Sequence, residues 1–349
     1  MRINQCVRHI GVIPTLAVAA FIGCSAGAQD IPAKQTPHDR LMAASASMSL
    51  EDAKSRPWHL KVEATVYDNK GQNPQVGTIE RWRNGEDQRT VFLFGDAKRT
   101  ELHSGGKYYG NSSGVMPYFA DEVLDRIMHS GPVEDDFYGT NSTLNKETLA
   151  KIPFDCIMLV RTGSNLASMP TGLFPTYCLL RDTNDLRISY DFGGEVIIFN
   201  RVGKFLDHEV PLTLTFNEGP ATVAKANVTS LAVFTPETNE FTSRPDEIEI
   251  GNQNIVRISG GVMAGHKLRG PNPVYPADAR MRHVSGTVVM RAVIGRDGHI
   301  HSLKAMSCPD PYLVMSALSA VRDWSYTPYV LNGAPTDVVT TITVNFNLN

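Results

Sequence analysis

Residues 323–335, DWSYTPYVLNGAP, decide the fold of the C-terminal part of the chain. Apolar side chains with helical spacing precede and enter this stretch, at Leu313, Ala317, Ala320, Val321 and Trp324. Asp310 is a typical N-cap and Pro311 suits a first helical turn, so a helix is predicted to begin there. Asn332-Gly333 predicts a tight turn into one last strand. We therefore expect Trp324 to fill the space between this helix and a sheet that contains the last strand.

The residues around this stretch predict the rest of that sheet. The last strand alternates between core-facing and solvent-facing side chains: Ile342, Val344, Phe346 and Leu348 against Thr341, Thr343, Asn345 and Asn347. Residues 286–295 and 299–306 predict two more strands joined by a hairpin, and residues 276–282 predict a short helix. The expected result is two helices on one face of a three-stranded antiparallel sheet.

Several short motifs in this block resemble the TonB C-terminal domain family, over residues 265–349. They are Pro273-Val274-Tyr275-Pro276 with Ala279, Gly286-Thr287-Val288, Asp297-Gly298, Ala320-Val321-Arg322 with Trp324, Tyr326 and Pro328, and Asn332-Gly333 before Pro335. The resemblance implies structural roles for Tyr275, Pro276, Gly286, Asp297, Gly298, Trp324, Tyr326, Pro328 and Gly333. Ser325 departs from the family, which usually has Arg or Lys after the Trp.

The resemblance implies protein–protein contact, because domains of this family pair a sheet edge with a short peptide of an outer-membrane transporter. An exposed sheet edge can accept an extended peptide as an added strand. We expect the last strand to offer that edge to an envelope protein, through Val339, Thr341, Thr343 and Asn345. The alternative is a purely structural or self-pairing strand.

The rest of the chain departs from an energy-transducing member of the family. Such proteins keep an N-terminal membrane helix and a long Pro-rich spacer. Here His9 precedes the apolar run, and about 200 residues of predicted sheet stand where the spacer would be. This difference argues against energy coupling.

Residues 57–234 predict a large antiparallel sheet, since short alternating strands and turn signals follow one another through this range. Helices are expected at 38–55, 117–131 and 145–152. The fold class is therefore α+β, with a curved, half-barrel-like sheet domain at 38–236, a linker at 237–264 and the C-terminal domain after it.

The strand and turn pattern of the first domain loosely resembles LolA/LolB proteins, in which a half-barrel closed by a helical lid holds acyl chains. Val66, Ile79, Phe92 and Phe94 would line such a cavity, or form an ordinary core. The alternative function is therefore a periplasmic carrier of lipid or another hydrophobic ligand.

The N-terminus has the pattern of a secretory signal peptide. Residues 1–10 are basic, residues 11–28 are uncharged, and Ala26-Gly27-Ala28 fits a cleavage site after Ala28, which leaves 29–37 as a leader. An uncleaved membrane anchor and a lipoprotein acylated on Cys24 are the alternatives. Export implies an oxidising compartment, in which Cys156 and Cys178 are expected to form a disulfide.

Composition and motifs do not favour nucleic-acid binding or catalysis. The net charge of −3 is too acidic for a typical nucleic-acid binder. Ser104 and Lys107 have an S-x-x-K spacing without its partner motifs, and His299 and His301 lack a third metal ligand nearby. We therefore expect a non-enzyme without cofactor or metal.

Overall fold

The computed structural model describes residues 35–53, 55–68, 70–162, 170–192, 195–237, 239–250, 256–331 and 334–348. From residue 36 onward they belong to one compact unit, Thr36–Asn349. The predicted signal peptide, Cys24 and the motif residue Gly333 lie outside the described residues. Among the helices that are described, none is both long enough and apolar enough to cross a membrane.

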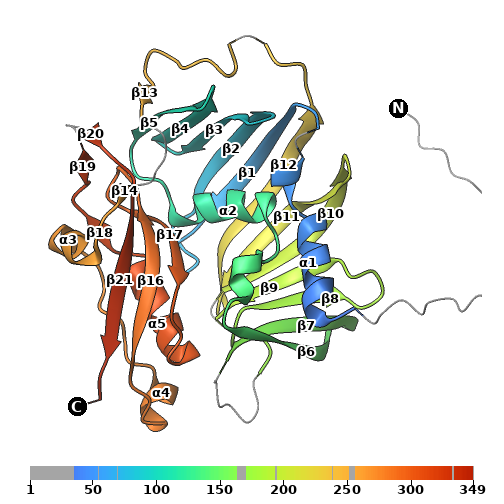
Figure 1. The fold of residues 1–349 in the computed structure, drawn as a ribbon, viewed down its shortest axis with the longest axis vertical. Coiled ribbons are helices and arrows are strands. Elements are labelled where there is room, and N and C mark those ends of the chain that lie inside the picture. The colour runs from blue at the N-terminus through green and yellow to red at the C-terminus, as the bar shows by residue number, and fades with distance from the viewer. Residues whose placement is uncertain are drawn as a thin grey trace, which may run out of the picture. The chain divides into compact units, whose positions relative to one another are not determined.

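A sheet of thirteen strands dominates the first part of the unit (Figure 1). Its strands are β1 Trp58–Val66, β2 Gln75–Asn84, β3 Asp87–Phe94, β4 Ala97–Ser104, β5 Lys107–Ser113, β6 Thr140–Leu149, β7 Ile152–Arg161, β8 Thr176–Leu180, β9 Leu186–Asp191, β10 Glu195–Phe205, β11 His208–Glu218, β12 Ala221–Val233 and β13 Ile248–Glu249. Their order is β13-β5-β4-β3-β2-β1-β12-β11-β10-β9-β8-β7-β6, with every pairing antiparallel. The predicted antiparallel sheet is thus confirmed.

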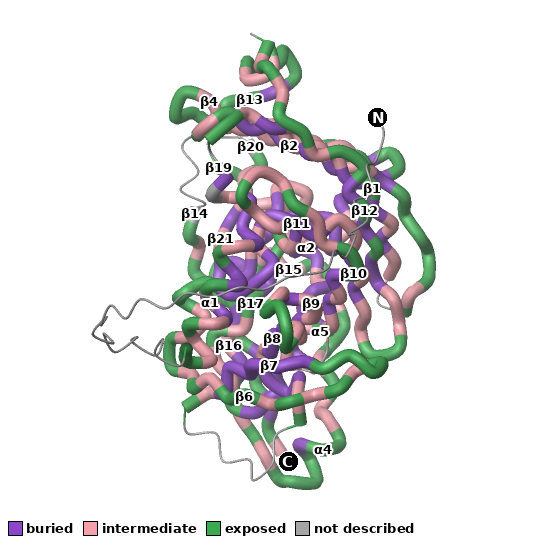
Figure 2. Tube along the Cα trace, turned by 90° about the vertical axis from the view of Figure 1, so that its right-hand side faces the viewer, coloured by how far each residue is buried: buried purple, intermediate pink, exposed green. Residues whose placement is uncertain are grey.

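Two helices and two short 3₁₀ turns accompany this sheet: α1 Pro37–Ser47, η1 Leu50–Asp52, α2 Tyr118–Met128 and η2 Glu134–Phe137. Thr36 caps α1, because its side chain accepts from the Asp39 N–H and the Asp39 carboxylate accepts from the Thr36 N–H. The apolar face of α2 contacts β1, β11 and β12 in the middle of the sheet. Most buried residues lie in the strands and in α2 (Figure 2), while the tight turns at residues 95–96, 105–106 and 219–220 are exposed.

The helix predicted at 145–152 is wrong. Residues 140–149 form β6, which pairs with β7 over ten residues without a register shift. The turn between these strands is built by Ala150 and Lys151, both with positive φ. Neither residue type favours that conformation, so the sequence carries no visible turn signal there and its charged residues suggested a helix.

The C-terminal part contains the predicted three antiparallel strands, β16 Gly286–Ile294, β17 Ile300–Ala305 and β21 Val338–Phe346. A fourth short strand, β14 Val256–Arg257, adds to β21 in parallel, which the sequence did not predict. The helices are α3 Gly260–Gly265, α4 Ala277–Met281 and α5 Pro311–Val321, and the remaining short strands are β15 Lys267–Arg269, β18 Ser325–Tyr326, β19 Val330–Leu331 and β20 Ala334–Pro335. Helix α5 begins as predicted, because the Asp310 side chain accepts from the Tyr312 N–H, 3.0 Å away.

The predicted linker, residues 237–264, contains β13, β14 and the start of α3. Residues 240–247 are held against the large sheet by Arg89 of β3. Its guanidinium donates to the carbonyls of Glu240 and Thr242, both at 2.7 Å, and pairs with Glu247. This part of the segment is therefore attached to the first sheet.

Candidate partner-binding edge

The family-motif residues fix the corners of the C-terminal sheet. Tyr275 donates its hydroxyl hydrogen to the carbonyl of Val284 and packs edge-on against Phe346, with ring centroids 5.6 Å apart. Pro276, the N-cap of α4, follows directly. A side chain on Gly286 would overlap Pro309, so the glycine permits the loop before α5 to cross the start of β16.

Asp297, Gly298 and Tyr326 meet at the β16–β17 turn. The Tyr326 N–H donates to the Gly298 carbonyl at 2.8 Å, and a Cβ on Gly298 (φ 77°) would overlap the Tyr326 carbonyl oxygen. Pro328 lies beside the same glycine. Asp297 accepts from the His299 N–H at 3.0 Å, and both of its carboxylate oxygens lie 3.0 Å from His301 Nε2. These motif residues therefore have structural contacts.

Trp324 packs against the C-terminal core, but it does not fill the space between α5 and the sheet as predicted. Its ring is only partly buried, and the space between α5 and the sheet is filled by other side chains, among them Leu313, Ala317, Val321, Val288 and Ile342. Trp324 instead lies on segment 267–271. Its Nε1 donates to the Pro271 carbonyl at 2.8 Å, and Lys267 Nζ lies 3.1 Å from the ring centroid. Gly270 (φ 149°) leaves room for the ring, because a Cβ there would overlap it.

Replacement of Trp324 by alanine is therefore expected to cost about 1–2 kcal/mol, less than the ~3–5 kcal/mol typical of a buried aromatic side chain. Urea unfolding of the variant would measure this cost. The matched comparison is Leu313→Ala, because Leu313 is fully buried on the core-facing side of α5. If Trp324→Ala lowered the free energy of unfolding more than Leu313→Ala does, the ring of Trp324 would have to be part of the core.

The predicted edge residues Val339, Thr341, Thr343 and Asn345 all lie on β21. The Val339 carbonyl accepts from the Ile258 N–H at 2.9 Å, so it points away from β16. Because backbone groups alternate in direction along an antiparallel strand, those of Thr341, Thr343 and Asn345 point the same way. The side chains of these three residues are also exposed.

Part of this edge is covered by the chain itself. β14 pairs with Val338 and Val339, and Gly260 is so close to the Thr341 carbonyl oxygen that a Cβ would overlap it. On the side of β21 that faces away from β16, no strand among the described residues pairs beyond Val339. The outward backbone groups of Thr343 and Asn345 therefore form the part of the edge that is not covered by another strand.

The opposite side of this small sheet faces the first sheet. β17 contacts α2, and Arg99 of β4 joins the two parts: it pairs with Asp121 of α2, and its Nη1 lies 2.9 Å from His301 Nδ1. Burial alone would raise the pKa of Asp297, but the interactions with His301 and His299 together outweigh it, so the pKa of Asp297 is lowered. The β17 side is thus occupied by contacts within the chain.

A second contact between the two sheets encloses acidic side chains. Arg322, the C-cap of α5, pairs with both oxygens of Glu218, at 2.6 and 2.7 Å. The pair lines a small cavity with Asp191, Glu195 and Tyr118, among others. Burial raises the pKa of Glu195 to about 8, and the neighbouring charge of Glu122 adds to the shift.

Within the described residues, no three potential metal ligands of the His, Cys, Asp or Glu type are grouped together.

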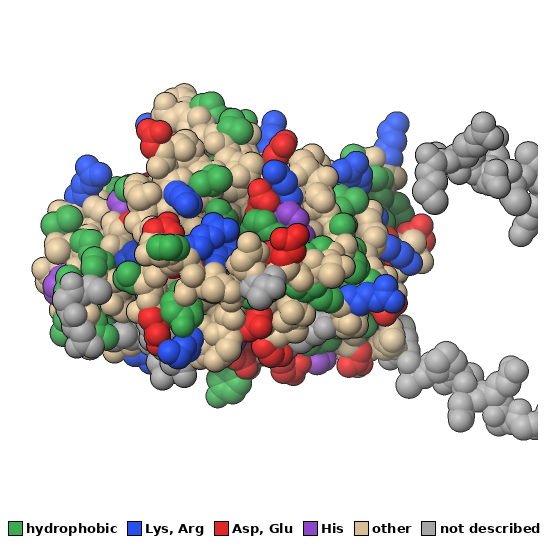
Figure 3. Space-filling model, turned by 90° about the horizontal axis from the view of Figure 1, so that it is seen from above, with side chains coloured by type: hydrophobic (Ala, Val, Ile, Leu, Met, Phe, Trp, Pro, Cys, Tyr) green, Lys and Arg blue, Asp and Glu red, His purple; other side chains and the backbone are tan. Residues whose placement is uncertain are grey.

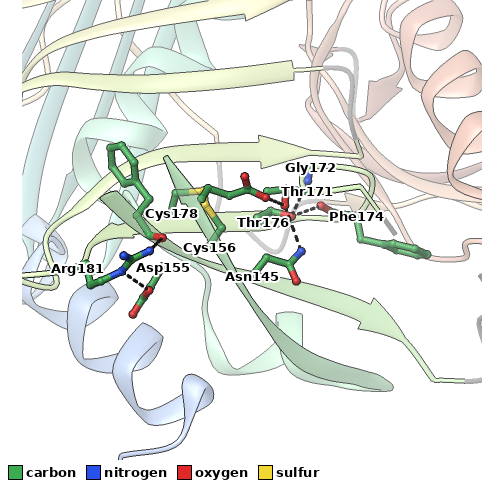
Figure 4. The surroundings of a disulfide bond; sticks show 11 residues. Asn145, Asp155, Cys156, Thr171, Gly172, Phe174, Thr176, Cys178 and Arg181 are labelled. Atoms are coloured by element: carbon green, nitrogen blue, oxygen red, sulfur yellow. Dashed lines mark hydrogen bonds and ion pairs between the residues drawn. A yellow bond between two sulfur atoms is a disulfide. The ribbon is translucent and has the colours of Figure 1, made fainter. Parts of the chain in front are cut away.

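The disulfide between Cys156 and Cys178 is confirmed. The two residues face each other on β7 and β8, buried in a small cluster with Phe154 (Figure 4). Beside them, Arg181 Nε donates to Asp155 at 3.1 Å. Closing this loop is expected to stabilise the protein by about 3 kcal/mol. Cys308 is a half-buried free thiol whose pKa burial raises to about 12.

The residues proposed to line a lipid cavity are buried. Val66, Ile79, Phe92 and Phe94 belong to one continuous core, which also includes the inward face of α2. A ligand at this position would therefore need α2 to move away from the sheet.

On the surface, acidic, basic and apolar side chains are mixed over the face shown in Figure 3.

Residues 271–348 match the family model of the Gram-negative bacterial TonB protein C-terminal. The resemblance of the motifs is thus confirmed, and these residues form a TonB-type C-terminal domain. No curated protein matches the chain.

Two solved structures are similar to larger parts of the chain. A DUF1329 family protein from Desulfovibrio piger is 11% identical, with a TM-score of 0.34 over 56% of this chain and 93% of that one. A LolA superfamily protein from Nitrosomonas europaea is 7% identical, with a TM-score of 0.38 over 60% of this chain and 99% of that one.

Proposed function

We propose that this protein is a non-catalytic binding protein of the cell envelope. Its TonB-type domain accepts an extended segment of a partner protein along the outer edge of β21. The observation that carries this proposal is the outward-pointing backbone of Thr343 and Asn345, which no strand of the described chain covers. Backbone groups in this arrangement can form a new ladder with an added strand.

The surroundings of this edge support the choice. The other side of the small sheet is held against α2 through β17. Side chains next to the open edge are short and polar, so they leave room for another backbone. The disulfide fits an oxidising compartment. A protein of the outer membrane, such as a transporter, is therefore the expected partner.

Replacement of Thr343 by proline tests the edge with little effect on the sheet. The Thr343 N–H points away from β16, so proline removes an outward donor and leaves the β16–β21 ladder paired. We expect partner affinity to fall about tenfold, as expected for one lost hydrogen bond. The partner would first be captured by a photo-crosslinker at Asn345 in the native host, and its segment then titrated against purified protein.

The matched control is Thr343→Ala, which removes the side chain but keeps the N–H, and it should bind within about twofold of the original protein. A crosslinker at Arg291, exposed on the central strand β16, controls for non-specific capture. Equal affinities of Thr343→Pro and Thr343→Ala would exclude strand addition at this position.

The alternative function, a carrier of a hydrophobic ligand, has less support. The candidate lining residues pack against α2, and the cavity beside Arg322 is lined by several carboxylates. Native mass spectrometry of protein purified from the envelope would test it, because a co-purifying lipid would favour the carrier.

A further inference from the structure

Residues 256–260 lie where a strand added to β21 would lie. β14 runs parallel to β21 and pairs Val256 with Val338 and Arg257 with Val339. The next residue, Ile258, donates its N–H to the Val339 carbonyl at 2.9 Å. Gly260 then packs directly on the Thr341 carbonyl oxygen. The chain thus covers the first half of the proposed partner edge with its own backbone.

This arrangement limits what a partner can bind without a rearrangement. Of the four outward-facing residues of β21, only Thr343 and Asn345 lie beyond the covered part. A strand rises about 3.3 Å per residue, so an added segment that continued past Thr343 towards Val339 would meet Gly260. A longer ladder therefore needs residues 256–260 to leave.

The contacts that hold this segment are few. Its pairing with β21 extends over two residues, and Ile258 is only partly buried against the core. Met263, three residues beyond Gly260, is fully buried in that core and anchors α3. Between segment and anchor, Gly261 has open space around it. The segment can therefore separate from β21 by rotation at this glycine pair while Met263 stays in place.

We infer that residues 256–260 act as an intramolecular competitor for the partner edge: they occupy Val339 and Thr341 in the free protein and are displaced by a longer partner strand. This inference rests on the proposed function of the same edge. The need for displacement lowers the apparent affinity of the partner, which equals the intrinsic affinity multiplied by the fraction of molecules in which the edge is open. It also favours partners long enough to replace the lost contacts.

Two adjacent glycines provide a matched test. In Gly260→Ala the new Cβ overlaps the Thr341 carbonyl oxygen, whereas in Gly261→Ala it meets nothing within 4 Å. Amide hydrogen exchange of Val339, measured by NMR on the purified full-length protein, reports whether residues 256–260 are paired with β21 there. We expect Val339 to exchange at least about tenfold faster in Gly260→Ala and at an unchanged rate in Gly261→Ala. The Ala292 amide in β16 checks that the sheet stays folded.

A labelled synthetic peptide of residues 256–263 then probes the opened edge. It should bind Gly260→Ala at least about tenfold more tightly than either the original protein or Gly261→Ala. If Gly260→Ala disturbs the sheet, Ile258→Pro replaces it, because it removes the one N–H that bonds Val339.

Two results would overturn the inference: exchange at Val339 as fast as at Thr343 in the original protein, or no difference between the variants that open the edge and Gly261→Ala. Both measurements use only this chain and its own peptide. They can therefore fail while partner binding at Thr343 is intact, and they can succeed when Thr343→Pro shows no effect on the partner.

Discussion

Replacement of Arg89 by alanine should lower the free energy of unfolding by about 3–5 kcal/mol, the range for breaking a buried ion pair. The side chain of Arg89 is 2% exposed and that of Glu247 is 0% exposed. The variant leaves the Glu247 carboxylate without its main partner in a dry environment. It also removes the donors that hold the carbonyls of Glu240 and Thr242.

Chemical denaturation of Arg89→Ala would measure this loss. The control is Lys107→Ala, which breaks an exposed pair with Glu249 nearby, where the side chains are 58% and 50% exposed. That loss should be far smaller than the loss for Arg89→Ala, because solvent screens an exposed ion pair. The double variant Arg89→Ala/Glu247→Ala should be less destabilised than Arg89→Ala alone, because no charge is left buried. Similar losses for Arg89→Ala and Lys107→Ala would mean that Glu247 is solvated.

Replacement of Glu195 by glutamine should instead raise the free energy of unfolding, and so stabilise the protein, at alkaline pH. Its pKa rises from 4.5 to about 8 in the folded state, mainly through burial. The folded protein therefore holds a proton that the unfolded chain releases, so stability decreases as pH rises from about 4.5 to 8. Glutamine removes this loss, and we expect a gain on the order of a few kcal/mol, at most about 5, at pH 8–9.

The measurement is the free energy of unfolding at several pH values. Near pH 4.5, Glu195→Gln and the original protein should differ little, and the gain should grow up to about pH 8. Glu63→Gln, on the exposed side of β1, is the control and should show no such trend. A gain that is the same at all pH values would show that the carboxylate of Glu195 is not held protonated.

The C-terminal domain could be predicted from sequence because its signals are local. Asp310 and Pro311 define the start of α5 without reference to the rest of the fold. The disulfide was predictable for a similar reason, since Cys156 and Cys178 lie on consecutive strands. In each case the relevant physical partners are close in the sequence.

The features that were missed depend on distant parts of the chain. The contact of Arg89 with Glu247 spans 158 positions, and neither residue has a pattern that indicates the other. The pairing of β14 with β21 involves too few residues to produce an alternation. Trp324 has helical spacing with the apolar residues of α5, but its ring contacts Lys267, Gly270 and Pro271. These residues precede it by more than fifty positions. Only tertiary contacts determine these positions.

The pairing of β1 with β12 has a consequence for folding. On one side of this pair, β1 to β5 form a meander, and on the other, β6 to β12 form a second one. Each meander can assemble from neighbouring strands, but the sheet is continuous only when Trp58 meets Val233. Until then two long, apolar strand edges are open at once, and such edges promote aggregation. The joining of these halves is therefore expected to be a late and slow step, at which the chain most needs a chaperone.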